Sequence, residues 1–407
     1  MLIAYKYRLY PTEEQKQFLA RTMGCARFVY NWALAIRKAD YDKQKAEGVE
    51  KPKTLSIYEI SRQLTQLKKK EEYSWLSEVS STSLIWALTN LDTAYKNFFR
   101  RIKKGGESAG FPKFKNKSGT QSFQFHQAYS VDFEKQTVSI PKMENIPVVF
   151  HRVFEGKMKT ATISREPSGR HYISILVETA NSLPDMPVDI STIIGIDHGI
   201  RNFITLSNGK TWENLRVEEK AAKRLARQAR KLSKKKLGSN NYKKQRVRKA
   251  VLEAHVADKR EGYIHQVTSE IIEHLKEKNI LSLAVRDYDI KKMVKKIEPK
   301  KSEVAAKKYE KNGRSLQKKL NRKIKDVAWG KFISVLAYKC LKNGIRFVEV
   351  ESPYTSTTCS HCGHNSKDNV NKDLFHCLAC GHQEHSDLNA AKNTAQLGMA
   401  KLQDLVV

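Results

Sequence analysis

Alternating apolar and polar side chains at the start of the chain predict a strand over residues 2–9, with one side buried and the other in solvent. A capping box of Thr12 and Gln15 then predicts the start of a helix, and apolar residues at helical spacing continue it for several turns. Two further segments, 56–70 and 81–103, repeat the helical spacing. The front of the chain is therefore expected to be one strand followed by helices.

Short strand patterns replace the helical spacing over residues 121–180. The turn residues Pro167-Ser168-Gly169 lie between two alternating runs and predict a β-hairpin. Together with the opening strand, these runs predict a small β-barrel domain that a helical insertion interrupts. The loop at 181–187, which contains two prolines, is typical of an interdomain linker.

Beyond the linker, the order of strand and helix patterns is typical of an RNase H-like α/β sheet, in which three antiparallel strands precede strands separated by helices. The predicted strands cover 193–196, 203–206, 210–212, 281–285 and 345–350. One predicted helix ends near Lys278, another covers 326–343, and a last one begins at Asp387. The predicted fold class is thus α+β with several domains.

A large excess of positive charge points to a polyanionic partner. The 407 residues carry 75 Lys and Arg against 43 Asp and Glu, a formal net charge of +32. Fourteen Lys and Arg and no acid lie between residues 220 and 249, and fifteen against three acids lie between residues 291 and 325. A solvated helical face is the ordinary explanation for a charged run, but unpaired charge on this scale favours nucleic acid.

Individual contacts to nucleic acid are less sharply defined. In the first basic run, the candidates are Arg224, Arg227 and Lys234. The segment 110–115, Gly-Phe-Pro-Lys-Phe-Lys, interleaves aromatic and cationic side chains, so Lys113 and Lys115 are candidates as well. Phe111 and Phe114 could stack on bases, and they fit a protein core equally well.

Four of the six cysteines predict a metal site. Cys25 and Cys340 are isolated within helical patterns. The others form two Cys-x-x-Cys knuckles: Cys359, Cys362, Cys377 and Cys380. Paired knuckles suit tetrahedral Zn²⁺ with thiolate ligands, whereas a disulfide framework is typical of small secreted chains. Such a closed site is structural, because four protein ligands leave no open position for catalysis.

A histidine could replace one of these cysteines as a ligand. The neighbouring candidates are His361, His364, His376 and His382.

No apolar run of about 18 residues exists to span a membrane, and Lys6 and Arg8 interrupt any apolar signal-type segment at the start. The sequence therefore predicts no membrane partner. It predicts a soluble protein of the prokaryotic cytoplasm, associated with the nucleoid.

Two acids occupy positions that suit phosphodiester chemistry. RNase H-like nucleases hold two divalent metal ions with carboxylates from the first strand, a central strand and a late helix. Asp197 follows Ile194-Gly195-Ile196 in the first predicted strand, and Asp387 begins the last predicted helix. The alternative is that both are ordinary solvated or salt-bridged acids.

Several motifs follow one another in a fixed order along nearly the whole chain. In the first half they are YKYRLYP (5–11), SWLSEV (74–79), NLDTAYKNFF (90–99) and GFPKFKNK (110–117). In the second half they are GIDHG (195–199), LAVRDYDIKKM (283–293), DVAWGKF (326–332), YTSTTCSHCG (354–363), FHCLACG (375–381) and SDLNAAKN (386–393). Together these motifs resemble the TnpB family, transposon-encoded RNA-guided nucleases related to type V CRISPR effectors. The resemblance implies one protein bound to one guide RNA, and a target double-stranded DNA flanked by a short motif.

The resemblance also implies a domain organisation. It comprises a wedge β-barrel domain (1–10 and 110–182), a helical recognition domain (11–109), a RuvC-like domain with the RNase H fold (190–350 and 385–407) and a zinc ribbon (351–384). By the same resemblance, the residues that read the flanking motif are Ile57, Ser61, Ser81, Thr82 and Ile85.

One position departs from the family pattern. The family's central strand carries a Glu that is the second metal ligand, and the corresponding position here, aligned through Met293, is Arg286. Asp287 should point to the opposite side of the strand, and Asp289 lies on the same side as Asp287. Ser386 also replaces the Arg that commonly precedes the last Asp.

The resemblance is thus to the TnpB-like nuclease-dead repressors (TldR), in which Asp197, Arg286 and Asp387 would be vestigial. Mg²⁺ would be required only if the nuclease site were active. Two other functions stay open. One is an active RNA-guided endonuclease in which another carboxylate replaces the lost ligand, and the other is a guide-independent DNA-binding accessory of transposition.

Overall fold

The computed structural model describes residues 1–50, 53–103, 110–180, 184, 186, 192–287, 293–294, 297–300, 312–351 and 354–404. The chain divides into two compact units, each with its own hydrophobic core. Unit 1 comprises Met1–Asn181 and Arg246–Val251, and unit 2 comprises Ser182–Gln245 and Leu252–Val407. The boundary at Asn181 falls in the predicted linker, of which only Pro184 and Met186 are among the described residues.

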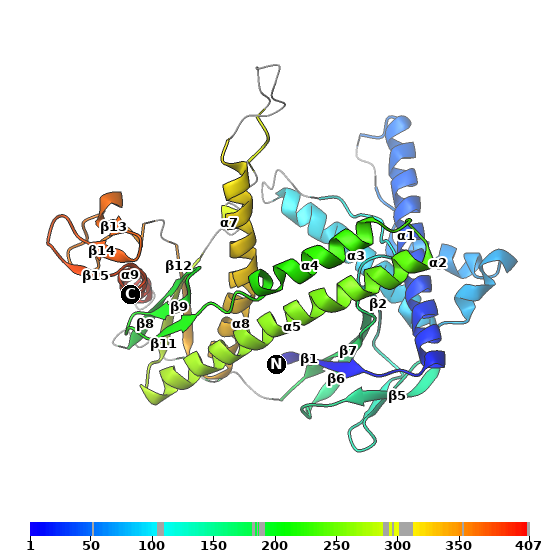
Figure 1. The fold of residues 1–407 in the computed structure, drawn as a ribbon. Coiled ribbons are helices and arrows are strands. Elements are labelled where there is room, and N and C mark those ends of the chain that lie inside the picture. The colour runs from blue at the N-terminus through cyan, green and yellow to red at the C-terminus, as the bar shows by residue number, and fades with distance from the viewer. Residues whose placement is uncertain are drawn as a thin grey trace. The chain divides into compact units, whose positions relative to one another are not determined.

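Unit 1 contains a seven-stranded antiparallel sheet (Figure 1). Its strands are β1 (Leu2–Leu9), β2 (Gln121–Phe125), β3 (Ser130–Asp132), β4 (Thr137–Ile140), β5 (Met143–Val149), β6 (Lys157–Arg165) and β7 (His171–Glu178). β6 and β7 form the hairpin predicted around Gly169. The opening strand lies inside the sheet, because β1 pairs with β7 along its whole length and with β5 at its end.

The predicted β-barrel is not closed. The strand order is β2-β6-β7-β1-β5-β4-β3, so β2 and β3 are edge strands of an open sheet in the described part of the chain. Barrel closure requires one further ladder between these two edges. The alternation of apolar residues is the same in an open and a closed sheet, so the sequence pattern could not distinguish them.

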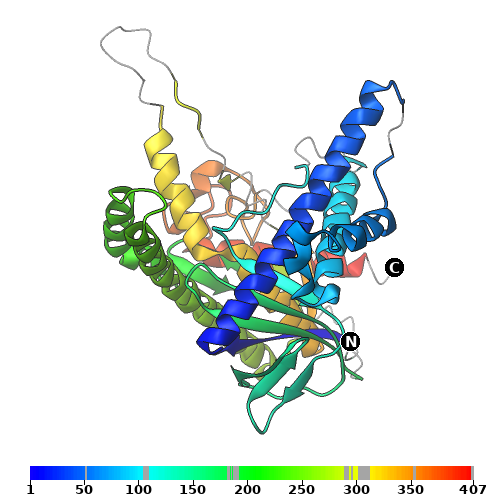
Figure 2. The same cartoon turned by 90° about the vertical axis from the view of Figure 1, so that its right-hand side faces the viewer.

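Capping boxes mark the beginnings of two helices in unit 1. The helices of this unit are α1 (Glu13–Ala46), α2 (Ile57–Leu67) and α3 (Ser81–Lys103), with a 3-10 segment at Glu71–Ser77. Thr12 and Gln15 form the predicted capping box, and Ser56 and Glu59 form a second one before α2. α1 and α3 pack against each other and against β2, and Figure 2 shows the length of α1 beside the sheet.

Unit 2 contains the five-stranded sheet that the sequence predicts. Its strands are β8 (Ile193–His198), β9 (Asn202–Leu206), β10 (Thr211–Glu213), β11 (Ser282–Arg286) and β12 (Arg346–Val350). The order is β10-β9-β8-β11-β12, with β8, β9 and β10 antiparallel and with β11 parallel to both β8 and β12. This is the arrangement of an RNase H-like sheet.

The helices of unit 2 differ from the prediction at one point. They are α4 (Val217–Ser233), α5 (Asn240–Glu277), α7 (Arg314–Val327), α8 (Trp329–Lys342) and α9 (Ser386–Gln403). The predicted single helix over 326–343 is wrong, because Ala328 has φ 56° and ends α7 before α8 begins. No glycine or proline marks this break, so the sequence carried no signal for it.

Helices cover both faces of the sheet in unit 2. Apolar residues of α5 and α8 join those of β8 and β11 in one core on one face. On the other face, α9 packs closely on β8: a Cβ at Gly195 would lie inside contact distance of the Ala391 carbonyl and the Ala395 amide. The glycine is therefore required for the close approach of α9.

A small three-stranded sheet lies between β12 and α9 in the sequence. It consists of β13 (Val370–Asn371), β14 (Leu374–His376) and β15 (Gln383–His385), with a 3-10 turn at Lys367–Asn369 before it. Its own small core contains Cys359, Phe375 and Cys377. We call residues 354–385 the ribbon.

Candidate functional site

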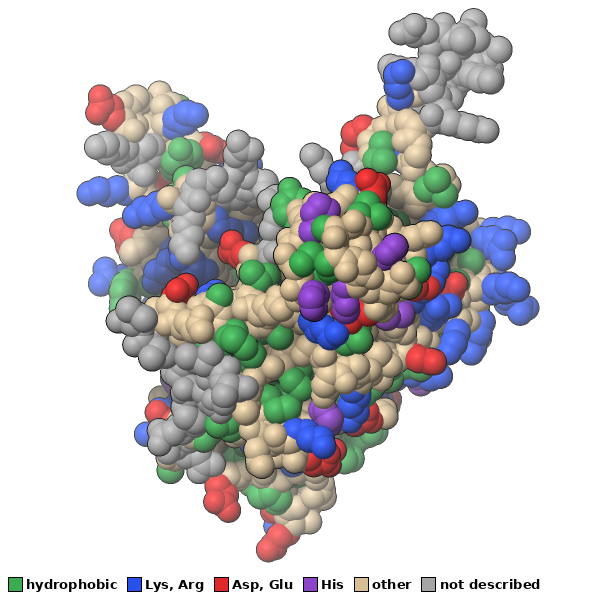
Figure 3. Space-filling model, turned by 90° about the vertical axis from the view of Figure 1, so that its left-hand side faces the viewer, with side chains coloured by type: hydrophobic (Ala, Val, Ile, Leu, Met, Phe, Trp, Pro, Cys, Tyr) green, Lys and Arg blue, Asp and Glu red, His purple; other side chains and the backbone are tan. Residues whose placement is uncertain are grey.

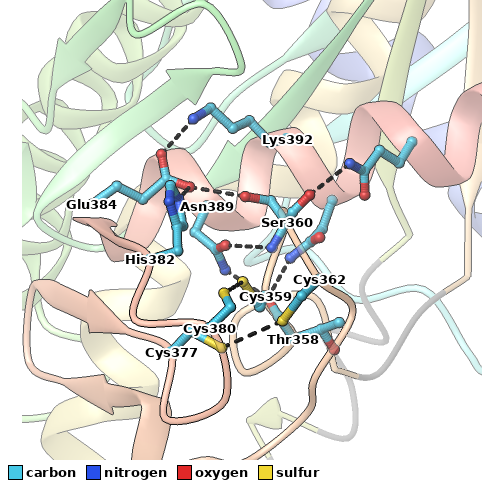
Figure 4. A network of polar contacts seen from close by, with 12 residues as sticks. Thr358, Cys359, Ser360, Cys362, Cys377, Cys380, His382, Glu384, Asn389 and Lys392 are labelled. Carbon is cyan, nitrogen blue, oxygen red and sulfur yellow. Dashed lines mark hydrogen bonds and ion pairs between the residues drawn. The ribbon is translucent and has the colours of Figure 1, made fainter.

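The four predicted cysteine ligands converge in the ribbon (Figure 4). Their sulfur atoms all lie within 4.8 Å of one another. The Sγ atoms of Cys359 and Cys380 are 3.7 Å apart, and those of Cys362 and Cys377 are 3.6 Å apart. Four thiolates at a zinc–sulfur distance of about 2.3 Å from one ion in tetrahedral geometry lie about 3.8 Å apart, so this arrangement fits Zn²⁺. The ligand set is all cysteine, without a substituting histidine.

The two knuckles share one backbone geometry. The Gly363 amide donates to the Cys359 carbonyl, and the Gly381 amide donates to the Cys377 carbonyl. Both glycines have positive φ, 77° and 73°, which favours glycine at these positions. Burial would raise the pKa of Cys377, but hydrogen bonds from the backbone amides of Cys380 and Ala379 lower it to about 6 and so favour the thiolate.

Polar side chains of α9 hold the ribbon in place. Asn389 Oδ1 accepts a hydrogen bond from the Ser360 amide, and its Nδ2 donates to the Thr358 carbonyl. Asn393 Nδ2 donates to the Thr355 and Thr358 carbonyls. Figure 4 also shows Glu384 joined to the Ser360 hydroxyl and to Lys392. The metal site is thus tied to the helix that covers the RNase H-like sheet.

Asp197 lies on the α9 face of that sheet. It is the fifth residue of β8 and is 7% exposed. Residues two apart on a strand share a face, so Asp197 points to the same side as Gly195, on which α9 packs. The neighbouring His198 points to the other side, where its ring contacts Trp329 and Phe332. Burial, with the nearby Arg286 charge, lowers the pKa of His198 to about 3, so its ring is neutral at physiological pH.

Arg286 ends the neighbouring parallel strand at the level of Asp197. The ladder pairs Val285 of β11 with Ile196 of β8, so Arg286 and Asp197 come next on the two strands and share a face. The Arg286 guanidinium donates a 2.7 Å hydrogen bond to the hydroxyl of Thr355, which is 1% exposed. A side chain of β11 is thereby joined to the start of the ribbon.

Asp387 lies in the first turn of α9. Its carboxylate accepts a 3.1 Å hydrogen bond from Asn202 Nδ2 of β9, and its backbone amide donates to His385 Nδ1. The N-terminus of a helix also favours a carboxylate through its dipole. Asp387 therefore has structural partners of its own. No local pattern in the sequence signals the roles of Asn202 and Thr355, because both contacts join distant parts of the chain.

Arg286 is the residue beside Asp197 where the TnpB-type pattern predicts a metal-binding carboxylate. The cysteine cluster is the one group of three or more metal-ligating side chains found among the described residues. At about 4 Å and an effective dielectric near 20, a guanidinium and a divalent ion repel by roughly 8 kcal/mol. The Asp287 amide donates to the Val350 carbonyl and continues the β11 ladder, which places the Asp287 side chain opposite that of Arg286. Asp289 lies outside the described residues.

The first basic run forms a helical hairpin of α4 and the beginning of α5. Gln245 Nε2 of α5 donates to Gln228 Oε1 of α4 at 2.7 Å. The three residues of this run that are predicted to contact nucleic acid are exposed, on α4 or in the turn after it: Arg224, Arg227 and Lys234. Lys and Arg side chains line one side of the face in Figure 3, and histidines gather near its centre. The second basic run falls partly on residues 301–311, outside the described part of the chain.

Neutralising this hairpin should weaken nucleic-acid binding and its salt dependence together. In the triple variant Arg224→Gln, Arg227→Gln, Lys234→Gln, we expect the slope of log K against log salt to fall by up to about 2.7, because each phosphate contact contributes roughly 0.9. Titrations at several salt concentrations measure this slope. The control neutralises Lys16, Lys43 and Lys135, which are already paired with acids. Equal slopes in the parent and the hairpin variant would show that these residues do not contact phosphates and lie on an ordinary solvated face.

The five residues predicted to read the flanking DNA motif lie in unit 1, as do Lys113 and Lys115, which are both exposed. Ile57 and Ser61 are one turn apart on α2, with Ile57 partly buried against the core. The first turns of α3 carry the remaining three: Ser81, Thr82 and Ile85. Ile85 is exposed, and the Thr82 hydroxyl is 2.7 Å from that of Ser80. α2 and α3 contact each other, so the five positions lie on two packed helices. Their role in reading a DNA motif stays a prediction.

The chain is similar to known proteins over nearly its whole length, and this similarity shows its family. Three family profiles match: "Helix-turn-helix domain" over residues 1–46, "Probable transposase" over 174–291 and "Cas12f1-like, TNB domain" over 329–394. The chain is 32% identical over 404 residues to "Putative RNA-guided DNA endonuclease InsQ" of Escherichia coli (strain K12), covering 98% of this chain and 93% of that protein. The chain belongs to the TnpB family. Although the first profile is named for a helix-turn-helix, residues 1–46 of this TnpB-family chain form β1 and the single helix α1.

A second relative and a solved structure extend the comparison. "Putative RNA-guided DNA endonuclease" of Streptomyces pristinaespiralis is 32% identical over 403 residues, covering 98% of this chain and 89% of that protein. The solved structure is titled "Cryo-EM structure of the Cas12f1-sgRNA-target DNA complex". It has a TM-score of 0.54 at 15% identity and covers 94% of this chain and 83% of that one, which shows a shared fold. Within the described residues, no helix has the length and apolar character to cross a lipid bilayer.

Proposed function

We propose that this protein binds double-stranded DNA under the direction of a guide RNA and does not cut it. The relatives that share nearly the whole chain are named RNA-guided DNA endonucleases, and the net charge of +32 suits a protein that holds RNA and DNA together. The stable R-loop, in which the guide pairs with one DNA strand, would block transcription when it lies over a promoter. Repression is thus the proposed outcome of binding.

The position of Arg286 carries the nuclease-dead part of this proposal. It lies beside Asp197 on the face of the sheet where a carboxylate would hold a metal ion, and it is hydrogen-bonded to Thr355. Compared with the Glu that the family pattern has at this position, the guanidinium of Arg286 adds one positive charge and removes one negative charge. Asp197 is the carboxylate next to Arg286 on this face of the sheet, whereas two-metal chemistry needs more ligands.

Guided binding is tested by comparing duplexes. The RNA that copurifies with the protein is sequenced, and the affinity is measured for a matching duplex, a duplex mismatched next to the flanking motif, and the matching duplex after RNase treatment. We expect tight binding in the first case alone, because base pairing supplies the sequence recognition. Equal affinity after RNase treatment would support the guide-independent accessory of transposition instead.

Restoring a carboxylate at the proposed lost ligand should raise metal affinity. In zinc-loaded protein, we expect Arg286→Glu to bind Mn²⁺ at least about tenfold more tightly than Arg286→Leu, as measured by the electron paramagnetic resonance of free Mn²⁺, because one variant adds a ligand and the other only removes the repulsion. Both variants lose the hydrogen bond to Thr355, so any loosening of the ribbon is common to them. Equal Mn²⁺ affinities would mean that position 286 is not the lost ligand.

The second candidate function is an active RNA-guided endonuclease, which the names of the relatives favour. It requires that another carboxylate join Asp197 and Asp387 in place of Arg286. Asp287 faces the other side of the strand, and Asp289, which the sequence places on the same side as Asp287, lies outside the described residues.

A further inference from the structure

The segment after α3 is held rigidly against α1, and we call its residues 110–115 the strap. Asn31 of α1 forms two hydrogen bonds with one strap residue: its Nδ2 donates to the Lys115 carbonyl at 2.9 Å, and its Oδ1 accepts from the Lys115 amide at 2.8 Å. The Lys115 ammonium lies 4.1 Å from the centre of the Tyr30 ring. The strap is therefore anchored to α1 at Lys115.

The strap presents aromatic rings to solvent rather than to a core. Phe114 is 56% exposed and Phe111 is 45% exposed, so the core alternative for these residues is wrong. The Phe111 ring packs edge-on against Tyr95 and Phe98, with centroids 5.4 Å apart in both pairs. Phe99, which contacts the same two rings, is 48% exposed. The result is a supported aromatic surface at the end of α3.

Positive charge surrounds these rings, without acids in the described flanking residues. Residues 96–103 contain four Lys or Arg, and residues 110–117 contain three Lys, while neither segment contains Asp or Glu. Of these cations, Lys96 is paired with Asp92. Exposed aromatic faces among an excess of cations are the combination that binds single-stranded nucleic acid, since rings stack on bases and cations contact phosphates. A protein partner would not require such an excess of one charge.

We propose that the exposed rings of Phe99, Phe111 and Phe114, which we call the platform, stack unpaired bases of single-stranded RNA. The inference rests on the proposed function, in which the protein carries an RNA throughout, and it assigns a contact for the unpaired part of that RNA. Because every base has a stacking face, the platform selects for single strands and not for sequence. The hydrogen bonds from Asn31 lower the entropic cost of binding by holding the strap in place.

The test measures binding of a twelve-nucleotide RNA without secondary structure, and of the DNA of the same sequence, to the full chain freed of copurified RNA. Phe114→Ala should lower the RNA affinity about tenfold, and Phe114→Leu should lower it similarly, because a leucine keeps apolar area but has no ring face. Phe114→Trp should retain the parent's affinity. Tyr41→Ala, which removes a 41% exposed ring from α1, is the matched control and should change nothing.

Each outcome has one meaning. Loss of RNA affinity in the alanine and leucine variants, with the tryptophan variant and the control unchanged, supports the platform. Unchanged RNA affinity in Phe114→Ala, full affinity in Phe114→Leu, or a loss confined to the DNA oligomer overturns it. Guide-dependent duplex binding is measured separately, so a protein that fails that assay and still loses RNA affinity in Phe114→Ala would refute the proposed function and leave the platform standing.

Discussion

Gly195→Ala is expected to lower the free energy of unfolding of unit 2 by about 3 kcal/mol, the upper range for overpacking. The added methyl group would meet backbone atoms of α9 at Ala391 and Ala395, whose Cα would be 3.0 Å away. Backbone of a regular helix cannot move aside as a flexible side chain can, so α9 as a whole would have to shift from β8. Hydrogen exchange of the β8 amides under increasing urea measures this loss within unit 2.

Gly262→Ala is the matched control in the same unit. Gly262 lies within α5 with no atom within 4 Å of an added Cβ. Alanine is a better helix former than glycine, so this variant should be about 0.5–1 kcal/mol more stable than the parent. If both variants changed the free energy of unfolding in the same direction, α9 would not approach β8 at Gly195 as closely as described.

Loss of one zinc ligand should release the metal and unfold the ribbon. The parent is expected to contain one equivalent of zinc per chain, and Cys377→Ser to contain almost none, because structural zinc sites contribute on the order of 10 kcal/mol to folding. The hydrophobic core of the ribbon contains few residues, so it does not replace the contribution of zinc to folding. Metal analysis of the purified protein and the proteolytic sensitivity of residues 354–385 are the measurements.

Cys340→Ala is the control for the zinc experiment. Cys340 is fully buried in the core of unit 2, away from the ribbon, and burial raises the pKa of its thiol to about 12. The variant should keep one equivalent of zinc and lose only the small stability of a shortened core side chain. Zinc-free parent protein with an intact, protease-resistant ribbon would contradict the metal assignment.

Local signals in the sequence predicted most of the elements. The capping box of Thr12 and Gln15 placed the start of α1, and the alternation of the opening residues placed β1. The spacing of the four cysteines predicted their cluster, because each knuckle is a local turn and two such turns complete a tetrahedral site. The three antiparallel and two parallel strands of unit 2 followed from the order of the patterns.

Local patterns in the sequence did not predict the contacts between residues that are far apart in the chain. The hydrogen bond between Asn202 and Asp387 joins residues 185 positions apart, and the bond between Arg286 and Thr355 joins residues 69 apart. Neither has a local pattern, because each depends on which strand lies beside which. The sequence also did not predict that the sheet of unit 1 is open, because the apolar alternation of β2 and β3 does not specify whether these strands pair with each other.

We propose that Arg286 leaves a protein that finds its target and does not cut it. The most direct measurement incubates the protein and its copurified guide RNA with a matching duplex in Mg²⁺ and follows both binding and strand cleavage. We expect a bound, intact duplex, with the same result for Asp197→Ala. Guide-dependent cleavage that Asp197→Ala abolishes would contradict this proposal and establish an active nuclease.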